Sequence, residues 1–219
     1  MKLRWLQLYL DPDERFDRYE AADFLARTRF VSNYFTRRVR KLAFPTDGFN
    51  MVGVLGSTSP TGLPRRGLDT AVLCTVKYDP AAFDWTSEAG IARPALQMLM
   101  EGIECCSEVE RIPLEEIRSF ATDFESDGYR HCWVAYSKVL RPRRVRADLE
   151  CTLTSKDFRL DLAVVAAGEE VRRLRVLDSR PREEFWEDEF KKPEIEGGFL
   201  VIRGRLGKET FRVAVDDLL

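Results

Sequence analysis

Apolar residues recur at helical spacing in the first half of the chain and alternate with polar residues over much of the second half. The clearest helical series is Ala21, Phe24, Val31, Phe35 and Leu42, with further apolar residues on an adjoining stripe. A helix with so wide an apolar face is expected to lie against a sheet.

The segment before this helix carries both a strand signal and helix-start signals. Residues 1–10 are mostly apolar and predict a first strand. Asp11 is expected to cap the helix, with Pro12 at the first helical position and Glu14 three residues after the cap, as in a capping box. The basic residues of 37–41 suit the negative end of the helix dipole and predict its end.

The rest of the chain divides into a mixed part and a meander. The expected elements are strands at 49–55 and 70–78, helices around Pro94 and over 112–127, and strands at 129–140, 145–153, 158–164, 171–178, 199–203 and 210–215. The fold class is therefore predicted to be α+β, with helices packed on an antiparallel, meander-rich sheet. A boundary near Ile112 would give parts 1–112 and 113–219, although one continuous domain is also consistent with this pattern.

Composition narrows the class of protein. With 219 residues, of which 44% are hydrophobic and 11% aromatic, the chain is long and apolar enough to bury a core. Its 35 basic and 37 acidic residues nearly cancel, which argues against a basic nucleic-acid arm. Five cysteines without a C-x-x-C pair favour a reducing cytosol. No segment approaches the length of a membrane helix or has the form of an export signal, so a soluble cytoplasmic protein is expected.

The single histidine limits the available chemistry. His131 alone cannot build a multi-histidine metal site, so neither a metal nor a cofactor is expected. A cysteine nucleophile paired with His131 would need Cys74 or Cys151 to be brought to it by the fold, and a hydrogen-bonding strand residue is the simpler interpretation. The Ser- and Gly-rich segment 56–64 lacks the G-K-[ST] of a phosphate loop and is expected to be an exposed loop.

One enzyme alternative rests on three residues. Asp178, Glu189 and Lys191 follow the order Asp…Glu-x-Lys of divalent-metal nucleases, in which two carboxylates hold the cation and the lysine supports the attacking water. That chemistry needs the Glu and Lys on one face of a strand, whereas the residues between Asp178 and Glu189 favour a loop or a short helix.

A second candidate site is an acidic and aromatic stretch. Its predicted partner-binding residues are Glu183, Glu184, Trp186, Glu187 and Asp188. A Trp surrounded by carboxylates suits a basic protein partner, because the aromatic ring contributes affinity and the acids steer encounter. The alternative is an amphipathic turn whose aromatic residues cover the end of the meander.

Arginine clusters supply the argument for nucleic acid. They lie at 37–41, 141–146 and 172–175, but each is close to acidic residues and none carries a known nucleic-acid-binding motif. Helix ends and strand edges are the simpler explanation of these clusters, and nucleic-acid binding stays an alternative.

Taken as a whole, the chain resembles bacterial immunity proteins of the toxin–antitoxin or polymorphic-toxin kind. The resemblance rests on a small acidic α+β body without catalytic motifs and on the stretch Glu183–Phe190. It implies a non-catalytic protein that binds one cognate toxin, with a negative surface against a basic nuclease site. The sequence thus predicts a protein-binding module rather than an enzyme.

Overall fold

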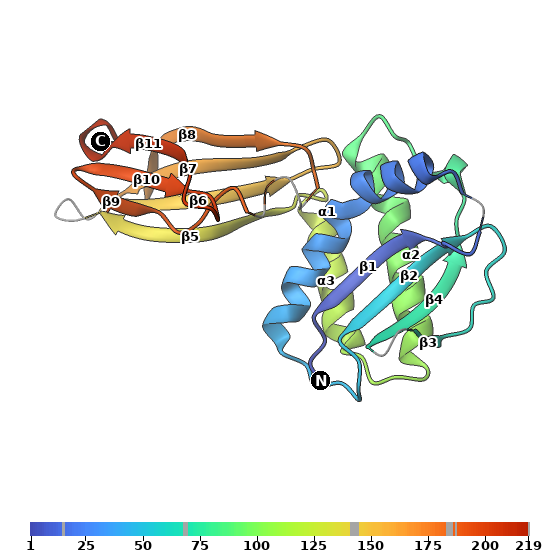
Figure 1. The fold of residues 1–219 in the computed structure, drawn as a ribbon. Coiled ribbons are helices and arrows are strands. Elements are labelled where there is room, and N and C mark those ends of the chain that lie inside the picture. Colours follow the sequence, from blue (N-terminus) through green and yellow to red (C-terminus); the bar gives the residue numbers. More distant parts are fainter. Residues whose placement is uncertain (15, 68–69, 141–144, 183–185, 187, 219) are drawn as a thin grey trace. The chain divides into compact units, whose positions relative to one another are not determined.

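The chain forms two compact units, Met1–His131 and Cys132–Leu219, in a computed structural model (Figure 1). The structure describes residues 1–14, 16–67, 70–140, 145–182, 186 and 188–218. The predicted boundary near Ile112 precedes the third helix, whereas the observed division follows that helix. Each unit is described separately below.

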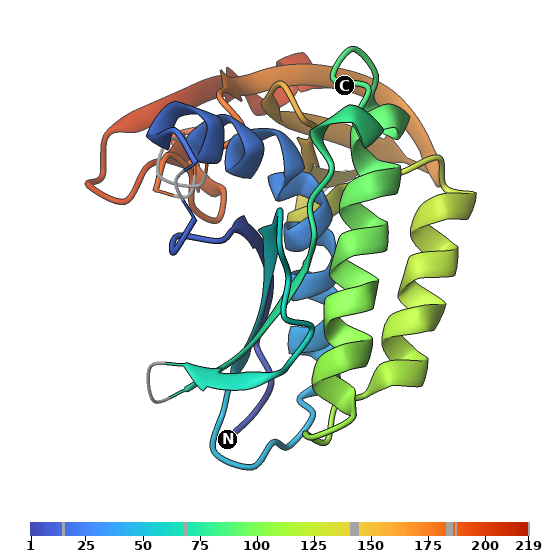
Figure 2. The same cartoon turned by 90° about the vertical axis from the view of Figure 1, so that its right-hand side faces the viewer.

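The first unit is a mixed sheet with helices on one side. Its elements are β1 (Trp5–Leu10), α1 (Arg18–Leu42), β2 (Met51–Ser57), β3 (Arg65–Gly67), β4 (Ala71–Lys77), the 3-10 helix η1 (Pro80–Ala82), α2 (Glu88–Ser107) and α3 (Leu114–Ser126). The strand order is β1-β2-β4-β3, in which β1, β2 and β4 are parallel and β3 is antiparallel to β4. Figure 2 shows α1, α2 and α3 on the same side of this sheet.

The α+β class is confirmed, and most strand pairs are antiparallel. The sheet that the helices cover is nevertheless built around three parallel strands and is separate from the antiparallel meander. The reason is connectivity, because α1 links β1 to β2 and returns the chain to the start of the sheet. The third helix belongs to this unit, since the ring of Phe124 lies 6.2 Å from Phe30 and 6.1 Å from Phe35 on α1.

Polar residues of α1 cover the outer edge of β1. The Leu6 amide donates to Thr36 Oγ1 at 3.1 Å, and the same hydroxyl donates to the Leu6 carbonyl at 2.9 Å. The Leu8 amide donates to Ser32 Oγ at 3.2 Å. Thr36 and Ser32 are both buried, so the broad helix face predicted from apolar spacing also contains the groups that complete the strand's hydrogen bonding.

The predicted start of α1 is wrong. The helix begins at Arg18, and Asp17 is the cap, accepting a hydrogen bond from the Tyr19 amide at 2.7 Å. Asp11 instead accepts from the Asp13 amide at 3.0 Å in the turn after β1. Glu14 makes its contacts outside the helix, with the loop that follows β2. These residues fit the local pattern of a capping box, but the contact of Glu14 with the loop after β2 overrides it.

The second unit is the predicted meander with a small additional sheet. Its elements are β5 (Cys132–Leu140), β6 (Val145–Leu153), β7 (Phe158–Ala166), β8 (Glu169–Ser179), β9 (Glu194–Glu196), β10 (Phe199–Arg203), β11 (Glu209–Ala214) and the 3-10 helix η2 (Val215–Leu218). The sheets have the orders β5-β6-β7-β8 and β11-β10-β9, and every pair is antiparallel. Strand β9, three residues long, was not predicted.

The predicted period of two places one face of the meander in the core. Leu149, Cys151, Leu160 and Leu162 on β6 and β7 are completely buried. Opposite them in the alternation are charged residues, so each strand contributes one apolar and one polar face. The hairpin of β6 and β7 keeps the register that this pattern requires, with Cys151 opposite Leu160.

Candidate functional site

Trp186, the centre of the predicted partner site, is part of the core. Its side chain is 6% exposed and stacks on Phe158, with ring centroids 4.1 Å apart and planes 9° from parallel. Trp133 lies on another side, at 6.2 Å between centroids. Because it is buried, Trp186 is not an exposed anchor. Its packing fits the alternative, in which the ring covers the end of the meander.

The acidic residues around Trp186 are only partly described. Glu183, Glu184 and Glu187 lie outside the described residues. Asp188 is exposed, with its Oδ2 3.1 Å from Arg205 Nη1, and its carbonyl oxygen accepts from the Arg205 amide at 2.6 Å. Of the predicted partner-binding carboxylates, Asp188 is the one among the described residues, and it already has a cationic neighbour.

The three residues of the nuclease alternative are engaged separately. Asp178 pairs with Arg175 at 2.8 Å, and Lys191 Nζ donates to the Arg205 carbonyl at 2.9 Å. Glu189 is exposed, and its carbonyl oxygen accepts from the Thr210 hydroxyl at 2.7 Å. Among the described residues no three His, Cys, Asp or Glu side chains are grouped so that they could hold a metal ion. The geometry gives the nuclease alternative no assembled site.

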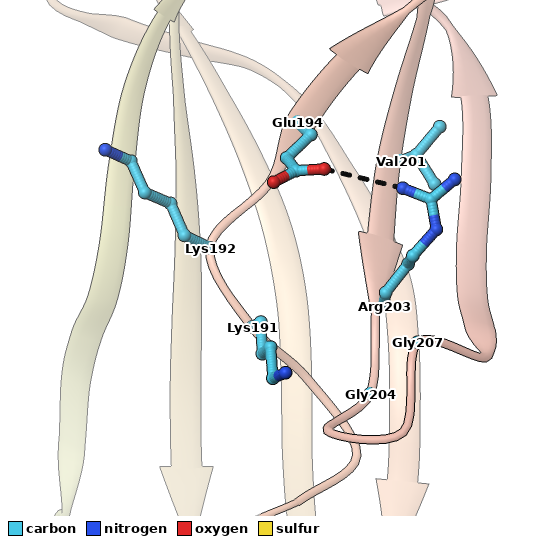
Figure 3. A pocket seen from close by; sticks show the side chains of 7 residues that line it. All are labelled: Lys191, Lys192, Glu194, Val201, Arg203, Gly204 and Gly207. Carbon is cyan, nitrogen blue, oxygen red and sulfur yellow. Dashed lines mark ion pairs between the residues drawn. The ribbon is translucent and has the colours of Figure 1, made fainter.

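A small hollow lies beside Lys191 (Figure 3). It has a volume of about 170 Å³, smaller than the roughly 300–1,000 Å³ of usual small-molecule sites. Its lining residues are Lys191, Lys192, Glu194, Val201, Arg203, Gly204 and Gly207. Arg203 is held across the hollow by Glu194 at 3.5 Å and is also paired with Glu196. Two charged groups of the hollow, Glu194 and Arg203, thus bind each other.

Several described arginines of the basic clusters pair with neighbouring acids. On β8, Arg173 pairs with Glu150 at 2.7 Å, and Arg175 pairs with Asp161 at 2.6 Å. On α1, Arg38 pairs with Asp123 at 3.0 Å. Residues 141–144 of the second cluster lie outside the described residues. These pairs are the cross-strand and interhelical contacts expected of structural arginines, which weakens the case for phosphate binding.

His131 is hydrogen-bonded, as predicted, but it is buried and precedes β5 instead of lying in a strand. Its Nε2 lies 2.8 Å from Asn33 Oδ1 on α1. Burial, aided by the positive charges of Arg37 and Arg38, lowers the pKa of His131 to about 3. Cys74, one of the two thiols considered as its partner, instead lies 2.6 Å from the sulfur of Cys105.

Glu14 is enclosed by hydrogen-bond donors in the loop after β2. Its carboxylate accepts from the Ser57 hydroxyl, from the Thr58 amide at 3.0 Å and from the Thr58 hydroxyl at 2.9 Å. These bonds, that of Ser57 foremost, lower the pKa of Glu14 to about 2. The segment considered for a phosphate loop thus binds a carboxylate of its own chain at the carboxyl ends of parallel strands.

An excess of acidic residues lies on α2 and α3. Residues 101–127 contain nine acidic and two basic residues, whereas α1 contains seven basic and two acidic residues. Glu101, Glu104 and Glu108 are spaced by three and four residues and share one side of α2. Arg118 joins the two helices, with its Nη2 2.9 Å from Glu104 Oε1.

We call this surface the acidic face. It consists of the exposed carboxylates Glu101, Glu104, Glu108, Glu115, Glu116, Asp123, Glu125 and Asp127. Among these carboxylates, Glu104 and Glu115 form ion pairs with Arg118, and Asp123 forms one with Arg38. In the turn between the helices Val109 is 62% exposed, which adds an apolar contact point.

Comparison with protein-family models, curated proteins and solved structures finds no significant match for the chain.

The total charge of the chain hides the acidic face, because 35 basic and 37 acidic residues nearly cancel. In a window of one helix-turn-helix, the excess of acidic residues is evident from the sequence alone. Clustered carboxylates create a negative potential at the surface. This arrangement can therefore attract and orient a cationic surface. Among the described residues no helix is long and apolar enough to cross a membrane.

Proposed function

We propose that the protein is a non-catalytic binding module that holds a basic protein partner on its acidic face. The observation that carries the proposal is the excess of carboxylates over 101–127, displayed on two adjacent helices. Complementary charge accelerates association and suppresses wrong partners. Exposed Val109, in the turn between the two helices, supplies apolar area next to these carboxylates.

The partner class that fits best is the catalytic domain of a bacterial toxin, so the proposed role is that of an immunity or inhibitor protein in the cytoplasm. A nuclease toxin carries a basic substrate site, and a negative surface can cover such a site. The resemblance to immunity proteins points to the same chemistry. The proposed interface is the acidic face and not the stretch around Trp186, because the ring of Trp186 is buried.

The interface is tested with a matched pair of triple variants. One variant carries Glu101→Gln, Glu108→Gln and Glu116→Gln, which remove three charges from the acidic face. The control carries Glu169→Gln, Glu189→Gln and Asp217→Asn, which remove three exposed charges from the second unit. Purified basic RNase and DNase domains of bacterial toxins serve as probes, with association rate, affinity and residual nuclease activity as readouts.

Wild-type protein and the control variant are expected to bind and inhibit one such domain, with an association rate that falls as salt increases. The acidic-face variant is expected to associate about tenfold more slowly, since steering is lost. Equal association rates for the two variants would exclude the acidic face as the interface.

Catalysis is tested separately. The purified protein is expected to be inactive with divalent metals on DNA, RNA, esters and phosphoesters. Metal-dependent cleavage of nucleic acid that is abolished by Asp178→Asn or Lys191→Ala would replace this proposal with the nuclease alternative.

A further inference from the structure

Two cysteines far apart in the sequence meet inside the first unit. Cys74 lies in the middle of β4, and Cys105 lies near the end of α2. Their sulfur atoms are 2.6 Å apart. Non-bonded heavy atoms in contact usually stay about 3.5–4.0 Å apart, whereas the sulfurs of a disulfide are about 2.05 Å apart. The fold therefore holds these two thiols much closer than ordinary packing would.

The two thiols differ in their access to solvent. Cys74 is 1% exposed, while Cys105 is partly exposed and its thiol donates to the Gly62 carbonyl at 3.1 Å. Cys106, the neighbour of Cys105, is completely buried. Burial raises the pKa of the Cys74 thiol and raises that of Cys106 to about 12. Of these three cysteines, Cys105 is the one that a reagent from solvent reaches first.

We propose that Cys74 and Cys105 are a modification site, which a hydroperoxide converts to a reversible disulfide. In the first step the Cys105 sulfur attacks the peroxide, the O–O bond breaks, and the products are a sulfenic acid and an alcohol or water. In the second step the Cys74 sulfur attacks the Cys105 sulfur, the S–O bond breaks, and water leaves with the Cys74 proton. The two thiols lose two electrons to the peroxide.

The bond would join β4 directly to α2. It would also remove the proton that Cys105 donates to Gly62, in the loop between β2 and β3. The same loop holds Glu14 through Ser57 and Thr58. Oxidation at this site therefore acts on the segment that leaves the carboxyl end of β2 and leads to β3.

The test counts free thiols after treatment of the folded protein with hydrogen peroxide, followed by unfolding and alkylation. The reduced protein has five free cysteines, and the treated protein is expected to have three. Peptide mapping should join the peptides that contain Cys74 and Cys105, with a mass about 2 Da below the sum of the two thiol peptides. A dithiol reductant should restore all five thiols.

Two variants act as controls. Cys132→Ser removes an exposed cysteine of the second unit and should leave formation of the Cys74–Cys105 bond unchanged. Cys105→Ser should leave Cys74 available for alkylation. The same peroxide applied to urea-unfolded protein should lose the preference for this pair, because the fold creates it.

Two results would overturn the proposal. One is a cross-link between Cys105 and Cys106 in place of Cys74. The other is retention of alkylatable Cys74 and Cys105 in the wild-type protein under conditions that oxidise exposed Cys132. Both are read on wild-type protein, so they do not depend on the stability of a variant.

Discussion

At the scale of single residues, Trp186 shows how burial changes the meaning of a sequence pattern. An aromatic ring among acids suits an interface, but this ring stacks on Phe158 and lies beside Trp133. A ring in this position contributes to the stability of the second unit through its packing.

Trp186→Ala is expected to lower the free energy of unfolding by about 3–5 kcal/mol, because it leaves a cavity beside Phe158. Trp186→Phe should cost less, about 1–2 kcal/mol, since it keeps an aromatic ring. It also loses no hydrogen bond to the described residues, because the indole nitrogen has no partner among them. Urea unfolding measures both variants, and an Ala variant as stable as wild type would show that the ring is not core.

His131 makes the stability of the first unit depend on pH. Its pKa falls from 6.5 to about 3 on folding, because burial disfavours the charged ring. Between these values the unfolded chain binds a proton that the folded protein does not bind. The free energy of unfolding therefore decreases as pH falls from 6.5 toward 3.

Over that range the contribution of His131 is on the order of 3 kcal/mol. His131→Gln, which keeps a donor for Asn33 and does not titrate, is expected to flatten the decrease. The measurement is urea unfolding at a series of pH values for both proteins. Parallel curves for wild type and variant would contradict the assignment of this pH dependence to His131.

At the scale of elements, the segment after β1 is fastened to the loop after β2 by Glu14. The hydrogen bonds from Ser57 and Thr58 are strongest when the Glu14 carboxylate is charged, so the contact depends on pH. Its folded pKa, about 2, lies below the ordinary value of 4.5. The stabilisation is complete above pH 4.5 and is lost as the pH falls toward 2.

Glu14→Gln is expected to destabilise the first unit at neutral pH and to reduce the change in its stability between pH 4.5 and 2. Glu116→Gln, which changes an exposed glutamate of α3, is the matched control and should keep the wild-type profile. Acid unfolding followed by circular dichroism measures both. A wild-type acid profile for Glu14→Gln would show that this contact does not contribute.

The local sequence pattern predicts which segments are helices or strands, but it does not predict which distant strands pair. Alternation in Val145–Leu153 and Phe158–Ala166 was enough to predict a hairpin and its buried face, because a period of two fixes which side chains share a face. The pairing of β1 with β2 could not be read in the same way, since 25 residues of α1 separate the two strands. A parallel pair carries no turn signal.

At the scale of the whole molecule, the chain consists of two compact units. The first depends on α3, because Phe124 is completely buried and its ring stacks on Tyr34 at 4.3 Å between centroids. The sequence boundary near Ile112 would separate this helix from its core, whereas the division after His131 retains it.

A fragment of residues 1–131 is therefore expected to unfold cooperatively with helical circular dichroism. A fragment of residues 1–112 is the control and should lose cooperative unfolding, since it lacks Phe124 and exposes the apolar side of α1. Cooperative unfolding of the shorter fragment would place the boundary where the sequence suggested. The comparison uses thermal melts of both fragments at equal concentration.

The separation of basic from acidic residues is also a property of the folded molecule. The near equality of 35 basic and 37 acidic residues conceals a basic α1 and an acidic α2–α3 region within one unit. Only the fold makes this separation visible as a surface, because it places Glu104 of α2 beside Arg118 of α3.

Local patterns along the chain predict the α+β class, most helices and strands, and the buried face of the meander. They can do so because periodicity and turn composition are local properties of the chain. The tertiary structure alone decided the parallel pairing of β1, β2 and β4, the burial of Trp186, the capture of Glu14 by the loop after β2 and the meeting of Cys74 with Cys105. Each of these depends on contacts between residues distant in sequence, for which local spacing carries no signal.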